Sequence, residues 1–102
     1  MILRKLNADK PNFKELYGMI EAMNQLLENS LKSTLTLEEL LRFQDVDGSF
    51  KLFDSYKVPG DARVDFCYMP TYIGTAILMK EYLNGKRYFA SQLQRALEAS
   101  LR

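Results

Sequence analysis

The sequence predicts a single all-α domain over residues 1–102, with four main helices arranged as two antiparallel helical hairpins. Apolar residues recur at spacings of three and four in several segments, which is typical of amphipathic helices. The sequence contains no strand candidate better than residues 62–68, and that one is weak. With 102 residues and a hydrophobic fraction of 47%, the chain is long enough to bury one core.

The first helix is expected to begin after a loose polar lead-in, residues 1–11, which ends at Pro11. Asn12 is a candidate N-cap, and Glu15 three residues later completes a capping box. Apolar side chains then recur on one predicted face, at Phe13, Leu16, Tyr17, Ile20, Met23, Leu27 and Leu31. Gly18 lies inside this helix, where it favours a close crossing with a neighbouring helix.

A second, shorter helix is predicted from Thr36, which forms another capping box with Glu39, to about Gln44. A long connection, residues 45–69, follows and contains five aspartates. Connections of this length without regular structure are uncommon in compact domains and are often functional. We therefore expect the functional region here.

The third helix is expected to start at Pro70, because proline suits the first helical turn. Residues 72–79 carry no charge, which predicts a helix buried on nearly all sides. Gly85 is a natural C-cap. A fourth helix follows, with one predicted apolar face that consists of Phe89, Leu93, Ala96, Leu97, Ser100 and Leu101.

Composition narrows the classes of function. The 14 basic and 13 acidic side chains nearly balance, so nucleic acid is not expected as a partner. No segment is apolar enough to cross a membrane, and the single cysteine, Cys67, with no apparent leader favours a cytoplasmic location. The absence of histidine removes the usual general base and the Ser–His and Cys–His nucleophiles. We assign no catalytic residue and no cofactor.

One motif joins the second helix to the third. Gln44 ends a helix and is followed by Asp47, Gly48 and Phe50, and the next helix opens with Pro70, Thr71 and Tyr72. A glutamine at a helix end can bond an unpaired backbone group of a neighbouring helix. Glycine permits a sharp reversal, and an aromatic ring can seal the junction. The motif is therefore interpreted as structural.

This pattern resembles the repeat of α/α-toroid proteins, the terpenoid cyclases and the β subunits of protein prenyltransferases. Gln44, Gly48 and Phe50 match the cyclase repeat, with Phe in place of its tryptophan, and residues 70–72 match the entry of the inner helix. The resemblance implies shape rather than activity. A toroid needs five or six helix pairs where this chain holds about two, and residues 72–83 lack the aspartate-rich catalytic motif. Residues 61–83 also resemble helical modules of bacterial multidomain proteins.

Two segments resemble parts of known metal sites. Asp65 and Cys67, followed by Tyr68, are similar to half of the prenyltransferase zinc site, but that family's third ligand is histidine. The aspartates at 45, 47 and 54 resemble a calcium loop, but the first ligand position falls on Phe43, which has no oxygen to offer. No metal is therefore assigned, and we interpret the aspartates as turn-forming residues.

The leading hypothesis is a non-catalytic helical module for assembly or interaction, which self-associates or belongs to a larger protein. The alternative is a small-molecule-binding or enzymatic fragment with a pocket between the long connection and the third helix. In that alternative Arg63 holds one carboxylate while another acts as acid or base. Its expected lining residues are Phe50, Tyr56, Asp61, Arg63, Asp65, Tyr68 and Tyr72.

Overall fold

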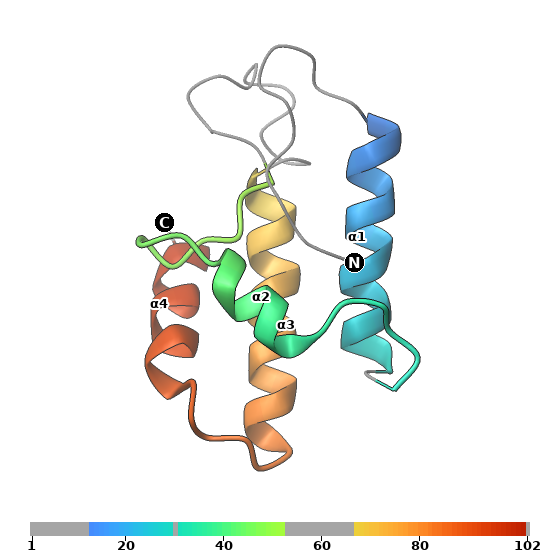
Figure 1. Cartoon of the computed structure of the whole chain (residues 1–102). Helices are drawn as coiled ribbons and strands as arrows, with labels where there is room; N and C mark the ends of the chain where they lie inside the picture. The colour runs from blue at the N-terminus through green and yellow to red at the C-terminus, as the bar shows by residue number, and fades with distance from the viewer. Residues whose placement is uncertain (1–12, 30, 53–66, 102) are drawn as a thin grey trace.

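The computed structural model describes residues 13–29, 31–52 and 67–101 of the chain. These residues contain four helices, α1 (Phe13–Glu28), α2 (Leu37–Phe43), α3 (Met69–Leu83) and α4 (Ala90–Ser100) (Figure 1). No strand occurs among them, so the predicted all-α class is confirmed. The lead-in at residues 1–11 and most of the long connection lie outside the described residues.

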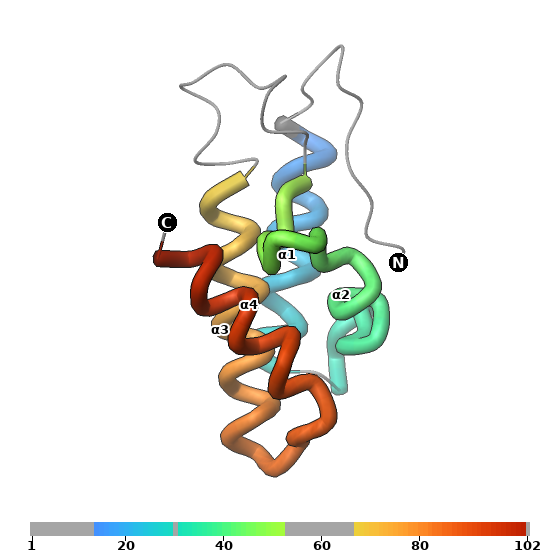
Figure 2. The backbone as a smooth tube through the Cα atoms, turned by 90° about the vertical axis from the view of Figure 1, so that its left-hand side faces the viewer, coloured from blue at the N-terminus to red at the C-terminus, as the bar shows by residue number. Residues whose placement is uncertain are grey.

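Helix α3 is the centre of the arrangement, because it packs against α1 on one side and α4 on the other. Figures 1 and 2 show that α1 and α3 run in the same direction, whereas α4 returns antiparallel to α3 after a short turn. The short helix α2 crosses in front of α3 in Figure 1. The toroid-like arrangement of these helices stays a prediction.

The N-terminus of α2 carries the predicted capping box. The Thr36 hydroxyl accepts a hydrogen bond from the Glu39 backbone N–H at 3.2 Å, and the Glu39 carboxylate accepts one from the Thr36 N–H at 3.2 Å. Caps of this kind stabilise a helix by about 1 kcal/mol. For a helix of seven residues, which is too short to be stable alone, the cap fixes where α2 begins.

The apolar face of α1 is rotated from the predicted one. Its centre runs through Leu16, Met19, Met23 and Leu26, all of which are buried. Tyr17 lies on the exposed edge of this face, and α1 ends before Leu31, which is 95% exposed. The prediction that both residues face the core is therefore wrong. Among the described residues Gly18 makes no close crossing either, since none of their atoms lies within 4 Å of the place where its Cβ would be.

The carbonyl end of α1 is bound by a side chain from another helix. The Lys80 ammonium of α3 donates to the backbone carbonyls of Leu26, at 3.2 Å, and of Leu27. The last turn of α1 contains no basic residue of its own. A cation at this end satisfies unpaired carbonyls and interacts favourably with the helix dipole.

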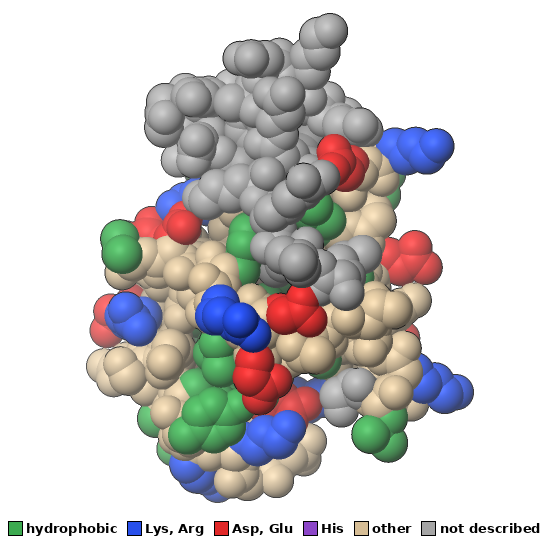
Figure 3. Space-filling model, viewed as in Figure 1, with side chains coloured by type: hydrophobic (Ala, Val, Ile, Leu, Met, Phe, Trp, Pro, Cys, Tyr) green, Lys and Arg blue, Asp and Glu red, His purple; other side chains and the backbone are tan. Residues whose placement is uncertain are grey.

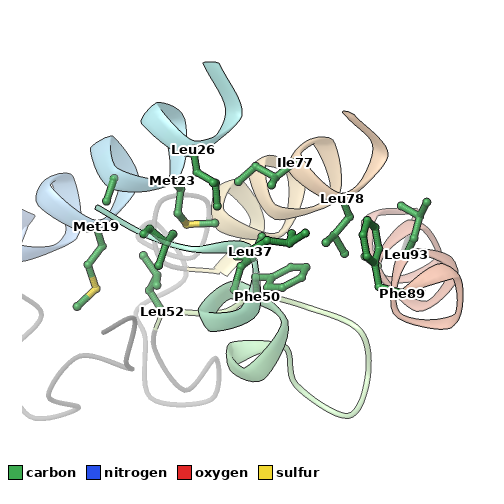
Figure 4. Close-up of a cluster of buried hydrophobic side chains, with 14 of the residues drawn as sticks. Met19, Met23, Leu26, Leu37, Phe50, Leu52, Ile77, Leu78, Phe89 and Leu93 are labelled. Atoms are coloured by element: carbon green, nitrogen blue, oxygen red, sulfur yellow. The ribbon is translucent and has the colours of Figure 1, made fainter. Parts of the chain in front are cut away.

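One hydrophobic core connects all four helices (Figure 4). Side chains from α1, α2 and α3 converge there with Phe50 and Leu52, and Phe89 and Leu93 enter from the α4 side. In α4 the predicted face is correct at Phe89, Leu93 and Ala96, but it is wrong at Leu97 and Leu101, which are exposed. The buried face of α4 is the part that contacts α3. It is narrower than the predicted apolar face.

Helix α3 differs from its prediction in one respect. It buries Thr71, Gly74, Thr75, Ile77 and Leu78, yet Tyr72 is 54% exposed and Leu83 is 71% exposed. The expectation of burial on nearly all sides is therefore wrong for one face, because neither α1 nor α4 covers it. The helix ends at Leu83, and Gly85, one residue beyond the C-cap Asn84, has a φ of +109°, the left-handed conformation expected of a glycine at this position. No described helix has both the length and the apolar composition needed to span a membrane.

Candidate functional site

The segment after α2 forms a tight turn that lies against α4. The Asp45 N–H donates to the Ser49 carbonyl and the Gly48 N–H donates to the Asp45 carbonyl, both at 2.9 Å. Gly48 has a φ of +93°, and a Cβ at this position would lie 2.1 Å from the Arg95 carbonyl oxygen. Two independent constraints therefore require glycine, namely the backbone conformation and the contact with α4.

Gln44 joins this turn to α4 through its side-chain amide. The Nε2 group donates to the Gly48 carbonyl at 3.0 Å and to the Gln92 carbonyl at 2.9 Å. Gln92 lies in the first turn of α4, so the amide bonds the flank of the helix and not its unpaired carbonyl end. Both protons of the amide nitrogen are thereby donated to backbone.

Phe50 joins the same turn to α3. Its side chain is completely buried, and a Cβ at Gly74 would lie 2.5 Å from the ring. The Phe50 N–H donates to the Thr71 hydroxyl at 3.1 Å, and that hydroxyl donates to the Cys67 carbonyl at 2.9 Å. We use the name clasp for Gln44, Gly48 and Phe50, which hold the turn against both α3 and α4.

Small polar residues line the contact between α3 and α4. The Thr75 hydroxyl bonds the Thr71 carbonyl at 2.7 Å and lies 3.3 Å from the Ala96 carbonyl. It is also 3.0 Å from the Ser100 hydroxyl, which donates to the Ala96 carbonyl. Because these groups satisfy one another, the two helices approach closely without leaving a buried hydroxyl unpaired.

The turn after α2 contains both acidic residues and a lysine that pairs with them. Lys51 Nζ lies 2.7 Å from Asp47 and 3.9 Å from Asp45, while the hydroxyl and backbone N–H of Ser49 donate to Asp47 at 2.6 and 3.1 Å. Partial burial alone would raise the pKa of Asp47. The hydrogen bonds from Lys51 and Ser49 outweigh it and hold that pKa well below its ordinary value. Across the described residues no three side chains of the metal-binding types gather in one place.

A hollow of about 140 Å³ opens between this turn and the start of α3. We call it the turn pocket; its described lining residues are Asp47, Ser49, Lys51, Cys67, Tyr68, Thr71, Tyr72 and Ala99. Tyr68 and Tyr72 belong to the predicted pocket, whereas Phe50 is buried and is not among the lining residues. The other predicted members, Tyr56, Asp61, Arg63 and Asp65, lie outside the described residues.

Two of the lining residues, Lys51 and Ala99, are not among those expected from the sequence. Lys51 was detectable, because a lysine four residues after Asp47 in an acidic turn is a natural ion-pair partner. Ala99 had no such signal, since it reaches the pocket only through the packing of α4 on α3. Of the residues quoted for the resemblance, Pro70 and Thr71 are buried at the start of α3 and Tyr72 is at the pocket.

A second hollow, of about 370 Å³, lies at the opposite end of α3. We call it the α3–α4 groove; it is lined by Met79, Tyr82, Leu83, Ala90, Leu93, Gln94 and Leu97, none of which is charged. Charges lie beside it, since the Arg87 guanidinium stacks 4.0 Å from the centre of the Tyr82 ring and Lys86 pairs with Glu81 at 3.3 Å. On the face shown in Figure 3, basic and acidic side chains are interspersed, and hydrophobic side chains gather beside them in the lower part of the view.

Comparison with protein-family models, with curated proteins and with solved structures gives no match for this chain. The resemblance to the α/α-toroid repeat therefore stays a prediction. What the chain does has to be inferred from its own geometry.

Proposed function

We propose that the chain is a non-catalytic helical assembly module that self-associates through the α3–α4 groove. The observation that carries this proposal is the exposed, uncharged side of α3 and α4. Leu83 is 71% exposed and Leu97 is 37% exposed, and both line the groove. Contiguous apolar surface of this kind is typical of protein interfaces.

A second copy of the chain is the occupant that the charges favour. In a two-fold contact the same patch meets itself, so a charge at its centre would face an identical charge. The groove avoids this because its lining is uncharged. The charges beside the groove have partners within the chain, because Arg87 stacks on the Tyr82 ring and Lys86 pairs with Glu81.

Sedimentation velocity over a range of protein concentrations tests the proposal. The wild-type chain is expected to shift from monomer to a larger species as concentration rises, and Leu83→Glu is expected to abolish the shift by placing a charge in the groove. Leu31→Glu is the matched control, because Leu31 is more exposed to solvent than Leu83 and lies outside the groove. A wild-type chain that stays monomeric at high concentration contradicts self-association.

A second candidate function, the binding of a small molecule, is favoured by the turn pocket. The hollow lies between the residues after α2 and the start of α3, the region of the pocket expected in the alternative hypothesis. It combines two tyrosines with a charged turn, and pockets with a few convergent polar groups are common ligand sites. No catalytic role is proposed for these residues.

A further inference from the structure

We propose that Tyr72 of one copy fills the α3–α4 groove of a second copy, and that the two α3 helices cross antiparallel at Ala76. This inference rests on the proposed self-association and deepens it, because it names the side chain that occupies the groove. It follows from the exposed side of α3, which continues the groove toward the start of that helix.

Every residue of α3 is among those described, and the exposed side of this helix carries no charge. The exposed residues from its N-cap to its end are Tyr68, Met69, Tyr72, Ala76 and Leu83. At 3.6 residues per turn they form one stripe with the half-buried Met79 of the groove, and we call this stripe the α3 face. The two charged residues of α3 are directed elsewhere, because Lys80 binds the end of α1 and the buried Glu81 pairs with Lys86. The α3 face can therefore meet a copy of itself without opposing like charges.

The α3 face projects on one side of Ala76 and is hollow on the other. Tyr68 and Tyr72, both about half exposed, lie before Ala76, and the groove at Met79 and Leu83 lies after it. At a rise of 1.5 Å per residue, Tyr72 is about 6 Å before Ala76 and the groove begins about 5 Å after it. Ala76 has the smallest side chain of the face, which allows two helices to approach closely there. The face is therefore complementary to itself when the second copy is antiparallel.

An antiparallel crossing at Ala76 directs each Tyr72 to the groove of the other copy. Tyr72 is four residues before Ala76, so it lies level with position 80, four residues after Ala76, in the other copy. Side chains on a helix lean toward the N-terminus of that helix. In the antiparallel copy this direction leads toward Leu83, which lines the groove.

The groove has the size and the chemistry to hold a tyrosine side chain. Its volume is about 370 Å³, whereas an apolar cavity of about 150 Å³ already holds a benzene ring. A tyrosine hydroxyl that becomes buried usually finds a hydrogen-bond partner, and the side-chain amide of Gln94 in the groove lining can supply one. An uncharged, mostly apolar hollow of this kind suits a phenol ring better than a charged side chain.

Disulfide trapping tests the crossing, with sedimentation velocity as the measure of self-association. Ala76→Cys places two thiols at the proposed axis, where closely packed helices come within the reach of a disulfide. Diamide is expected to join two copies of this variant about ten-fold faster than two copies of Gln25→Cys, because association raises the effective concentration of the thiols at the axis. Gln25 is the control because it is exposed on α1. Cys67 is buried and present in every variant, so the wild-type chain gives the background rate.

The outcomes separate the crossing from self-association itself. Faster trapping of Leu97→Cys, on the α4 side of the groove, than of Ala76→Cys overturns the crossing while supporting a contact through the groove. Equal rates for Ala76→Cys and Gln25→Cys in a chain that self-associates also overturn the crossing. A wild-type chain that stays monomeric overturns both proposals.

Two substitutions test the role of the ring. Tyr72→Ala is expected to weaken self-association about ten-fold, because a buried aromatic residue often dominates an interface. Tyr72→Phe keeps the ring and is expected to stay within about three-fold of wild type, since it loses one hydrogen bond only. Tyr88→Ala is the matched control, because Tyr88 is at least as exposed as Tyr72 and lies outside the α3 face and the groove lining. Circular dichroism at low protein concentration checks that each monomer is folded, and equal association of the Tyr72→Ala and Tyr88→Ala chains contradicts the inference.

Discussion

The side-chain amide of Gln44 and the backbone carbonyl of Gln92, 48 positions apart in the chain, are joined by a hydrogen bond of 2.9 Å. The same amide nitrogen also binds the Gly48 carbonyl. Three segments, the end of α2, the turn and α4, therefore meet at one side chain.

Replacement of Gln44 by alanine is expected to lower the free energy of unfolding by about 1–3 kcal/mol, because two partly buried carbonyls lose their donor. Urea unfolding followed by circular dichroism measures the change. Gln25→Ala, on the exposed side of α1, is expected to lie within about 0.5 kcal/mol of wild type. Similar values for the two variants would show that the amide contributes nothing to the clasp.

Gly74→Ala is expected to destabilise the fold by about 1–3 kcal/mol, because the added Cβ would overlap the buried Phe50 ring. Gly18→Ala is the matched control at a helical glycine, because no atom of the described residues lies within 4 Å of its added Cβ, and it is expected to stabilise the fold by about 0.5–1 kcal/mol. Thermal unfolding of both variants checks the opposite signs. A Gly74 variant as stable as the Gly18 variant would contradict the contact.

Leu93→Ala and Leu97→Ala are expected to have different effects, although both residues line the groove. Leu93 is buried in the core, so its truncation is expected to cost about 2–5 kcal/mol of stability. Leu97 is partly exposed, so its truncation is expected to weaken self-association and leave the monomer folded. Sedimentation together with denaturant unfolding at low protein concentration separates the two effects. If Leu97→Ala weakened self-association only by unfolding the monomer, the result would contradict the groove as the interface.

Acid is expected to weaken the acidic turn through Asp47. Its pKa is lower in the folded chain than the ordinary value of 3.8, so the carboxylate stabilises the fold fully above about pH 5. This contribution is lost as the pH falls through 3.8 toward the folded-state pKa. After allowance for solvent screening it amounts to about 1 kcal/mol. Asp47→Asn is therefore expected to be less stable at pH 7 and to lose less stability between pH 5 and 3.

Unfolding experiments from about pH 7 to pH 3 on wild type and Asp47→Asn measure this difference. Glu28→Gln, which removes an exposed carboxylate on α1, is the control. Parallel pH profiles for wild type and the Asp47 variant would show that the ion pair with Lys51 does not stabilise the turn.

The sequence predicts those parts of the fold that local chemistry determines. Three features depend on neighbouring residues only and lie where predicted. They are the Thr36 cap, Pro70 in the first turn of α3, and Gly85 just after the end of α3. Exposure of Tyr72 and Leu83 was missed, because the uncharged run at 72–79 does not reveal which sides of α3 find a neighbour. That depends on the number of helices packed around it, which no local pattern encodes.

The candidate sites were predictable to different degrees. The sequence motif identifies Gln44, Gly48 and Phe50 as junction residues. Their contacts with α3 and α4 cannot be deduced from the motif and are seen only in the structure. The α3–α4 groove is not predictable as a hollow from the sequence, because residues of two helices line it together. Arg63 and its acidic neighbours lie outside the described residues, so their part in the alternative pocket stays a prediction.

The bond from Lys80 to the end of α1 has a consequence for how the domain unfolds. Since α1 lacks a basic residue in its own last turn, the charge that terminates it comes from a helix more than fifty positions later. Thermal motion that separates α3 from α1 would therefore also fray the end of α1. We therefore expect the N-terminal helix and the central helix to melt together, and a truncated chain without α3 would leave the end of α1 without the Lys80 ammonium.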